Sequence, residues 1–122
     1  IVSSAYADNK NIYECVITQI SNSNNLSSLD KYYLNKAFKV DRMTGVMTGT
    51  LINGYINDPI VIDSGSETNS FKVVNYLKAI EGLGKGSNIY ALVVEEYRTG
   101  EIKPFTYMQN DWVFRGNCQT KN

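Results

Sequence analysis

The chain contains 122 residues, of which 43% are apolar and 20% are charged, with twelve basic and twelve acidic side chains. This length and composition predict one folded domain around a single core, and they are not typical of disordered or fibrous chains. The sequence has no block of five or six like charges and no apolar stretch as long as a transmembrane helix, so we expect neither a nucleic-acid partner nor membrane insertion.

The first residues resemble the end of an export signal. Ala5 and Ala7 have the small-x-small spacing that signal peptidase recognises. We interpret residues 1–7 as the remnant of a signal peptide, with a disordered N-terminus as the alternative, and residues 8–122 as a single β domain. The signal interpretation predicts a periplasmic or secreted protein.

The next segments predict a strand, a short helix and a second strand. Residues 12–20 are rich in β-branched and aromatic side chains and are flanked by polar residues, which is typical of a strand. Leucine and tyrosine at three- and four-residue spacing predict a short helix near residues 28–36. A period of two then begins at residue 37, and it places Phe38, Val40 and Arg42 on one face.

Two glycines predict turns around the next strand, at residues 46–52. Gly45 follows Thr44 and is expected in the left-handed conformation, which reverses the chain into this strand. Asn53-Gly54 predicts a tight type I′ hairpin turn after it. The remaining strands are expected at 59–63, 70–77, 88–97, 102–108 and 112–116, and Gly82, Gly84 and Gly86 are expected to form a linker.

About eight short antiparallel strands and one helix predict a mainly β fold, either a meander barrel or a strongly coiled sheet. Cys15 lies in the first strand and Cys118 follows the last, and we expect a disulfide between them, with two free buried cysteines as the alternative. The bridge requires the first and last strands to meet, which favours a sheet closed on itself.

Three segments of the chain form a pattern, framed by Tyr13-x-Cys15 and Gly116-x-Cys118. They are Phe38-Lys-Val-Asp-Arg-Met-Thr-Gly45, Asn69-Ser-Phe-Lys-Val73 and Lys103-Pro-Phe105. This pattern resembles a family of small uncharacterised exported bacterial β-proteins. The resemblance implies bacterial export and no particular activity. The opening Tyr-x-Cys and the closing cysteine are also similar to C-type lysozyme inhibitors, which are eight-stranded barrels. Their Ser-Gly-x-x-Tyr loop is absent, because Ser64-Gly65 is followed by Ser-Glu-Thr.

The residue inventory leaves little catalytic chemistry. The chain has no histidine, and a disulfide would engage both cysteines, so carboxylates, lysines and tyrosines remain. Glu95 and Glu96 are expected on opposite faces of a strand and therefore do not act as a pair. A carboxylate-dependent hydrolase would have to pair one of them with Asp41, Asp63 or Glu101 through tertiary contacts. The oxygen-rich loop at 63–67 is interpreted as a solvated turn rather than a calcium site.

The sequence therefore predicts an exported, non-catalytic binding domain for an unknown protein or small ligand, without catalytic, cofactor or metal residues. The alternatives are the hydrolase and a protein similar to a lysozyme inhibitor. The possible binding residues are Arg42, beside the Thr44-Gly45 turn, and Tyr97 and Arg98, beside a second expected turn at Thr99-Gly100. Paired or solvated arginines are the alternative. Among the aromatic residues, Tyr13, Tyr90 and Trp112 are expected inside, and contact residues are expected among Tyr32, Tyr33, Tyr55, Tyr97 and Tyr107.

Overall fold

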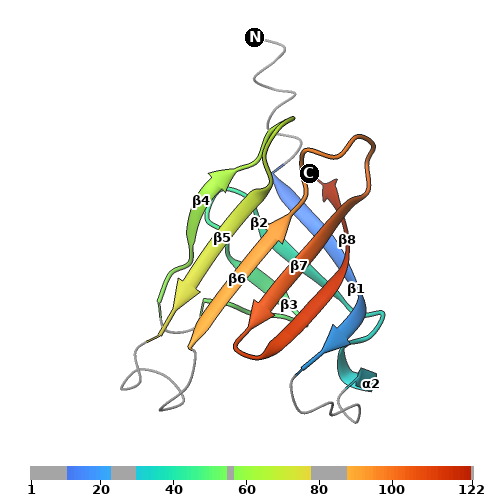
Figure 1. Cartoon of the computed structure of the whole chain (residues 1–122), viewed down its shortest axis with the longest axis vertical. Coiled ribbons are helices and arrows are strands. Elements are labelled where there is room, and N and C mark those ends of the chain that lie inside the picture. The colour runs from blue at the N-terminus through green and yellow to red at the C-terminus, as the bar shows by residue number, and fades with distance from the viewer. Residues whose placement is uncertain (1–10, 23–29, 55–56, 78–87, 122) are drawn as a thin grey trace.

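The computed structural model describes residues 11–22, 30–54, 57–77 and 88–121, which form one antiparallel sheet of eight strands (Figure 1). The strands are β1 (Ile12–Ser21), β2 (Ala37–Asp41), β3 (Met47–Gly49), β4 (Ile60–Ser64), β5 (Phe71–Tyr76), β6 (Ile89–Val94), β7 (Lys103–Gln109) and β8 (Trp112–Lys121), and one short helix, α2 (Asp30–Tyr33), precedes β2. The predicted class, mainly β with about eight antiparallel strands and one short helix, is confirmed. α2 has four residues, and the described part of the chain contains no helix with the length and hydrophobicity of a membrane span.

The sheet is a meander whose first and last strands are neighbours. Its order is β3-β2-β1-β8-β7-β6-β5-β4, so consecutive strands pair everywhere except between β3 and β4, which are the two edges. The sheet curls into a half-barrel in which β2 and β3 pass behind β5, β6 and β7 (Figure 1). β1 and β8 pair in the middle of the sheet, whereas the strands at its two ends, β3 and β4, do not pair with each other. The sheet is therefore not a closed barrel, and of the two predicted forms the coiled sheet is observed.

The predicted disulfide joins β1 to β8. Cys118 lies within β8 rather than after it, because this strand continues to Lys121 and does not end at residue 116 as expected. Cys15 and Cys118 are directly opposed in the register of these strands, with an S–S distance of 2.06 Å and a Cα–Cα distance of 4.0 Å. Their sequence separation is 103 residues. On the chain-entropy model, a loop of this size stabilises the fold by about 4.7 kcal/mol before any native strain is subtracted.

Large side chains fill the interior of the half-barrel. Alternate residues of the strands point inward, as the period of two predicts, and aromatic rings meet edge to face inside. The largest fully buried side chains are Tyr13, Ile17, Phe38, Val40, Met47, Phe71, Val73, Leu92, Val94, Phe105 and Tyr107.

Tyr107 does not lie on the surface, contrary to the expectation for it. It is completely buried, since it shares the inner face of β7 with Phe105, and its ring lies 6.0 Å from that of Phe114. The other aromatic residues divide as follows: Tyr13 and Tyr90 are buried, Tyr33 and Trp112 are half-buried, Tyr32 and Tyr97 are exposed, and Tyr55 lies outside the described residues.

The helix is shorter than predicted. α2 covers four residues of the expected 28–36, and residues 28 and 29 lie outside the described part of the chain, as does the predicted glycine linker. Asn35 ends the helix in the left-handed conformation, with φ of 64°, and its N–H donates to the carbonyl of Ile17 at 2.7 Å. The chain therefore leaves the helix already attached to β1.

The predicted hairpin at Asn53-Gly54 is wrong. β3 and β4 do not pair, and Gly54 does not have positive φ, which a type I′ turn requires. Asn53 is buried and its side-chain amide has a different role, because it accepts from the N–H of Met47 at 2.8 Å and donates to the carbonyl of Gly45 at 3.0 Å. The amide thus occupies the free edge of β3 as a peptide group of another strand would.

A second buried asparagine connects this edge to β5. Asn75 lies on β5, and its amide nitrogen donates to the carbonyl of Asn53 and to that of Asn57 at 3.0 Å. Asn57 in turn donates to the carbonyl of Tyr76 at 2.9 Å. Side-chain amides therefore hold together the part of the half-barrel where the sheet has no backbone ladder.

Candidate functional site

The β2–β3 turn is built around Asp41 and Gly45. Asp41 Oδ1 accepts the N–H groups of Met43 and Thr44 at 2.9 and 3.3 Å, and the N–H of Gly45 donates to the Asp41 carbonyl at 2.7 Å. Gly45 has a φ of +81°, as predicted. The turn leaves Arg42 on the inner side, in continuation of the alternation along β2.

Arg42 lies against the aromatic core rather than in solvent. Its guanidinium carbon is 4.5 Å from the ring centre of Tyr13 and 6.0 Å from that of Phe71, both within the range of a cation–π contact. Its Nη2 is 3.8 Å from Glu96 Oε1, and 17% of the side chain is exposed. The paired arginine, given as the alternative above, is therefore the observed arrangement of Arg42.

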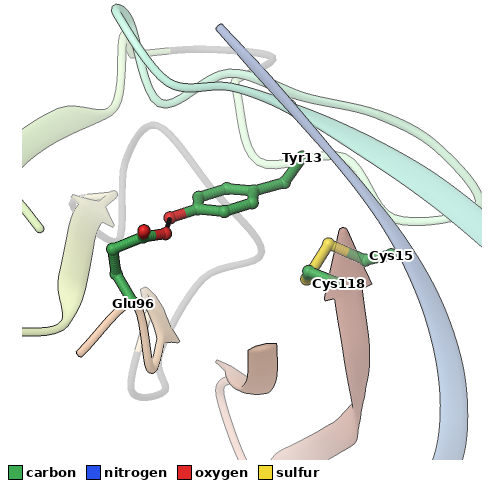
Figure 2. Close-up of a disulfide and its surroundings, with 4 residues drawn as sticks. All are labelled: Tyr13, Cys15, Glu96 and Cys118. Atoms are coloured by element: carbon green, nitrogen blue, oxygen red, sulfur yellow. Dashed lines mark hydrogen bonds between the residues drawn. A yellow bond between two sulfur atoms is a disulfide. The ribbon is translucent and has the colours of Figure 1, made fainter. Parts of the chain in front are cut away.

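Glu96 joins three elements at this end of the half-barrel. Tyr13 donates its hydroxyl hydrogen to Glu96 Oε1 at 2.5 Å, and Figure 2 shows the two side chains pointing at one another, with the disulfide close by. Lys103 Nζ lies 3.9 Å from Glu96 Oε2 and donates to the Glu96 carbonyl at 3.0 Å and to the carbonyl of Arg98. We call Tyr13, Arg42, Glu96 and Lys103 the inner cluster.

The inner cluster has the chemistry of a structural ion network. One carboxylate lies between two cations, so its negative charge is balanced where it is partly buried. Burial, followed by the hydrogen bond to Glu96, raises the pKa of Tyr13 far above its usual value, so the hydroxyl stays neutral. The cluster ties β1, the β2–β3 turn and the start of β7 together.

The second predicted contact turn forms an outer cluster of Glu95, Tyr97 and Arg98. Glu95 Oε1 accepts from Arg98 Nε at 2.6 Å and from the hydroxyl of Tyr97 at 3.1 Å. The hydrogen bond from Arg98 is the largest cause that holds the pKa of Glu95 below its usual value. Because 56% of the Arg98 side chain is exposed, this turn offers a charged and aromatic surface to solvent.

The acidic residues considered for a hydrolase are not gathered into one site. Glu95 and Glu96 follow β6, which ends at Val94, so they do not lie on a strand as expected. Their carboxylates still have different partners, since Glu95 pairs with Arg98 and Glu96 with Arg42 and Lys103. Asp41 is engaged in its own turn, Asp63 Oδ2 pairs with Lys72 at 3.3 Å, and Glu101 is exposed on the loop before β7.

The loop at 63–67 is a turn with internal hydrogen bonds. Asp63 Oδ1 accepts the N–H of Gly65 at 2.9 Å, and this bond is the main cause that lowers the pKa of Asp63. In the ranges that the structure describes, no group of three acidic or cysteine residues is close enough to hold a metal ion.

The outer face of β4 and β5 has an apolar surface that the sequence analysis did not single out. Ile60, Ile62 and Tyr76 are 58%, 59% and 56% exposed, and with Val74 they line a half-open hollow of about 440 Å³. Asn57, Asp58 and Asn75 complete its lining. We call Ile60, Ile62, Val74 and Tyr76 the β4–β5 patch.

A sequence signal for this patch exists in Pro59-Ile-Val-Ile-Asp63. Both faces of this strand carry β-branched residues, although only Val61 reaches the interior, where it packs against the core. A strand that is apolar on both faces is typical of burial on both sides. At an edge of a sheet, the same pattern leaves one apolar face uncovered.

Comparison with models of protein families, with curated proteins and with solved structures gives no match.

Proposed function

We propose that this protein is an exported, non-catalytic binding domain that holds its partner on the β4–β5 patch. The observation that carries the proposal is the patch itself, since three large apolar side chains, each more than half exposed, surround one hollow. Exposed apolar side chains gathered in one place are typical of interaction sites. A volume of about 440 Å³ also falls within the range of sites that hold an apolar ligand or a side chain of a partner.

The filled interior supports binding on the outside. The half-barrel encloses tyrosine, phenylalanine and aliphatic side chains that pack against one another, which favours the outer surface for a partner. The hollow at the patch contains one carboxylate, Asp58, and a smaller hollow of about 260 Å³ beside β2 and β3 contains one, Glu14. Glycosidase-like catalysis uses two carboxyl groups on one substrate.

The disulfide supports export. Structural disulfides form and persist in oxidising compartments, and they are rare in reducing ones. Cys15 and Cys118 are both buried, at 0% and 1% exposure, so the bridge has the position of a structural staple.

The binding proposal is tested by titrating the labelled protein with indole and recording backbone amide chemical shifts. We expect the shifts to cluster on β4 and β5, because the hollow offers the ring an apolar wall and polar groups at its rim. The variant Ile62→Lys should abolish this cluster. Ile102→Lys is the matched control, since Ile102 is 48% exposed and lies outside the patch. Shifts scattered over the surface, or equal effects of the two variants, would contradict the proposal.

A further inference from the structure

The two edges of the sheet differ in how their backbone groups are used. At the β3 edge, the side-chain amide of Asn53 accepts a hydrogen bond from the N–H of Met47 and donates one to the carbonyl of Gly45. β3 itself is only three residues long. β4 is the last strand of the order and pairs only with β5 among the described residues. Within the described ranges, no backbone group therefore bonds to the far side of β4, and a further strand can pair there.

We infer that β4 binds an extended peptide segment of a partner protein as an added antiparallel strand, with aliphatic side chains at alternate positions and a basic residue at one end. This inference rests on the proposed function and names the kind of partner. Strand addition draws affinity from main-chain hydrogen bonds and specificity from pockets for alternate side chains. The β4–β5 patch supplies such a pocket directly beside the open edge.

The apolar part of the peptide follows from the faces of β4. Ile60 pairs with Val74 across β4 and β5, so both lie on the outer face together with Ile62 and Tyr76. Alternate side chains of an added strand point to this same face and cover the exposed isoleucines. Pro59 and the bulge between Val61 and Asp63 shorten the ladder, so side-chain burial has to supply much of the affinity.

The basic residue follows from charge. Asp58 is exposed in the lining of the hollow, and in the described residues no cation pairs with it. Asp63, near the other end of β4, is already paired with Lys72. A Lys or Arg that reaches Asp58 therefore balances the one charge of the hollow that has no counter-ion among the described residues. Since Asp58 precedes β4, an antiparallel strand brings its C-terminal end there, and the sheet contains only antiparallel pairs.

A second copy of this chain fits the edge less well. Two β4 strands that paired antiparallel about Val61 would place Asp58 opposite Ser64 of the other copy, and no cation would face it. The inference therefore commits to a basic, apolar peptide. Pairing between copies is one outcome of the test.

The test uses the synthetic peptide acetyl-Val-Thr-Ile-Thr-Val-Thr-Lys-amide and the full chain. Changes in the backbone amide chemical shifts of β4 during titration measure the affinity of the peptide. Two further peptides carry N-methyl groups on alternate amides, one on the odd positions and one on the even. In an antiparallel strand only alternate N–H groups face the neighbour, so we expect one methylated peptide to bind at least about tenfold more weakly and the other to bind nearly as well as the parent.

The variant Asp58→Asn should bind the parent peptide about two- to fivefold more weakly than the wild type does. A peptide with glutamate in place of lysine should lose no affinity when Asp58 is replaced. Ile62→Lys should abolish binding, while Ile102→Lys leaves it unchanged. Equal binding of the two methylated peptides would overturn strand addition and leave the proposed function standing if indole still binds at the patch. No peptide binding, or self-association of the chain that fades with Ile62→Lys, would also overturn it.

Discussion

Two neighbouring glutamates organise the two turns in opposite ways. Glu95 accepts from Tyr97 and Arg98, which lie beside it on an exposed turn, so the whole outer cluster is local in sequence. Glu96 accepts from Tyr13, 83 positions away, and faces Arg42 from another strand pair. A glutamate, a tyrosine and an arginine thus lie on the surface in the outer cluster, and the same three residue types join distant strands in the inner cluster. Burial and sequence separation, rather than residue type, decide the energetic weight of each set.

The largest difference in stability between matched variants of the two turns is expected at their glycines, Gly45 and Gly100. In Gly45→Ala, the new Cβ would lie 2.7 Å from Val73 Cγ1 at a φ of +81°, so we expect the free energy of unfolding to fall by about 2–5 kcal/mol. In Gly100→Ala, φ is +95° but no atom lies within 4 Å, so we expect a loss of about 1–2 kcal/mol. Urea unfolding measures both, and equal losses would contradict the distinction between a packed and a free turn.

The arginines should show the next largest difference. Arg42→Ala removes a cation from Glu96 and a flat group from two aromatic rings, so we expect a loss of about 1–3 kcal/mol in the free energy of unfolding. Arg98→Ala removes an exposed ion pair and should leave the urea midpoint almost unchanged. A larger effect for Arg98 would show that the outer cluster also organises the fold.

Tyr13 and Tyr97 provide a further matched pair of variants, with smaller expected losses of unfolding free energy. Tyr13→Phe removes the hydrogen bond to a partly buried carboxylate, and we expect it to cost about 1–2 kcal/mol of unfolding free energy. Tyr97→Phe removes an exposed bond to Glu95, and the expected loss is within about 0.5 kcal/mol. Thermal or urea unfolding at neutral pH distinguishes them, and a neutral Tyr13→Phe would contradict a structural role for the Tyr13–Glu96 bond.

The inner cluster should also make stability fall in alkali. The pKa of Tyr13 is raised above its ordinary value of 10.0 by burial and by Glu96, so the folded chain holds a proton that the unfolded chain has lost above pH 10. The contribution of the neutral Tyr13 hydroxyl to the free energy of unfolding is therefore present below pH 10 and is lost as the pH rises further. Unfolding curves recorded between pH 9 and 11.5 should decline less steeply for Tyr13→Phe than for the wild type.

The outer cluster should give the smallest effect, at the acid end. The pKa of Glu95 is lowered beneath its ordinary value of 4.5, mainly by Arg98, so its contribution is present above about pH 4.5 and is lost as the pH falls. Glu95→Gln should reduce the acid sensitivity of the urea midpoint slightly, and 1 M salt should remove the difference because the pair is exposed. A difference that persists in salt would indicate a pair shielded from solvent.

Sequence reasoning was most successful where the determinant is local. The period of two correctly placed Phe38, Val40 and Arg42 on one face, and the Thr-Gly sequence correctly gave Gly45 a left-handed conformation, since both depend on adjacent residues. It failed at Asn53-Gly54, where the turn propensity of the pair was outweighed by the burial of the Asn53 amide at the edge of β3.

The mainly β class, the approximate positions of the strands and the pairing of the two cysteines could be predicted without a structure, because alternation and cysteine number are properties of the chain alone. The edges of the sheet could not be predicted in this way, and the β4–β5 patch and the site of the proposed partner depend on them. An isoleucine of β4 is the same residue whether a further strand covers it or not. Its exposure depends on where the curled sheet stops, and that in turn depends on contacts between residues far apart in the chain.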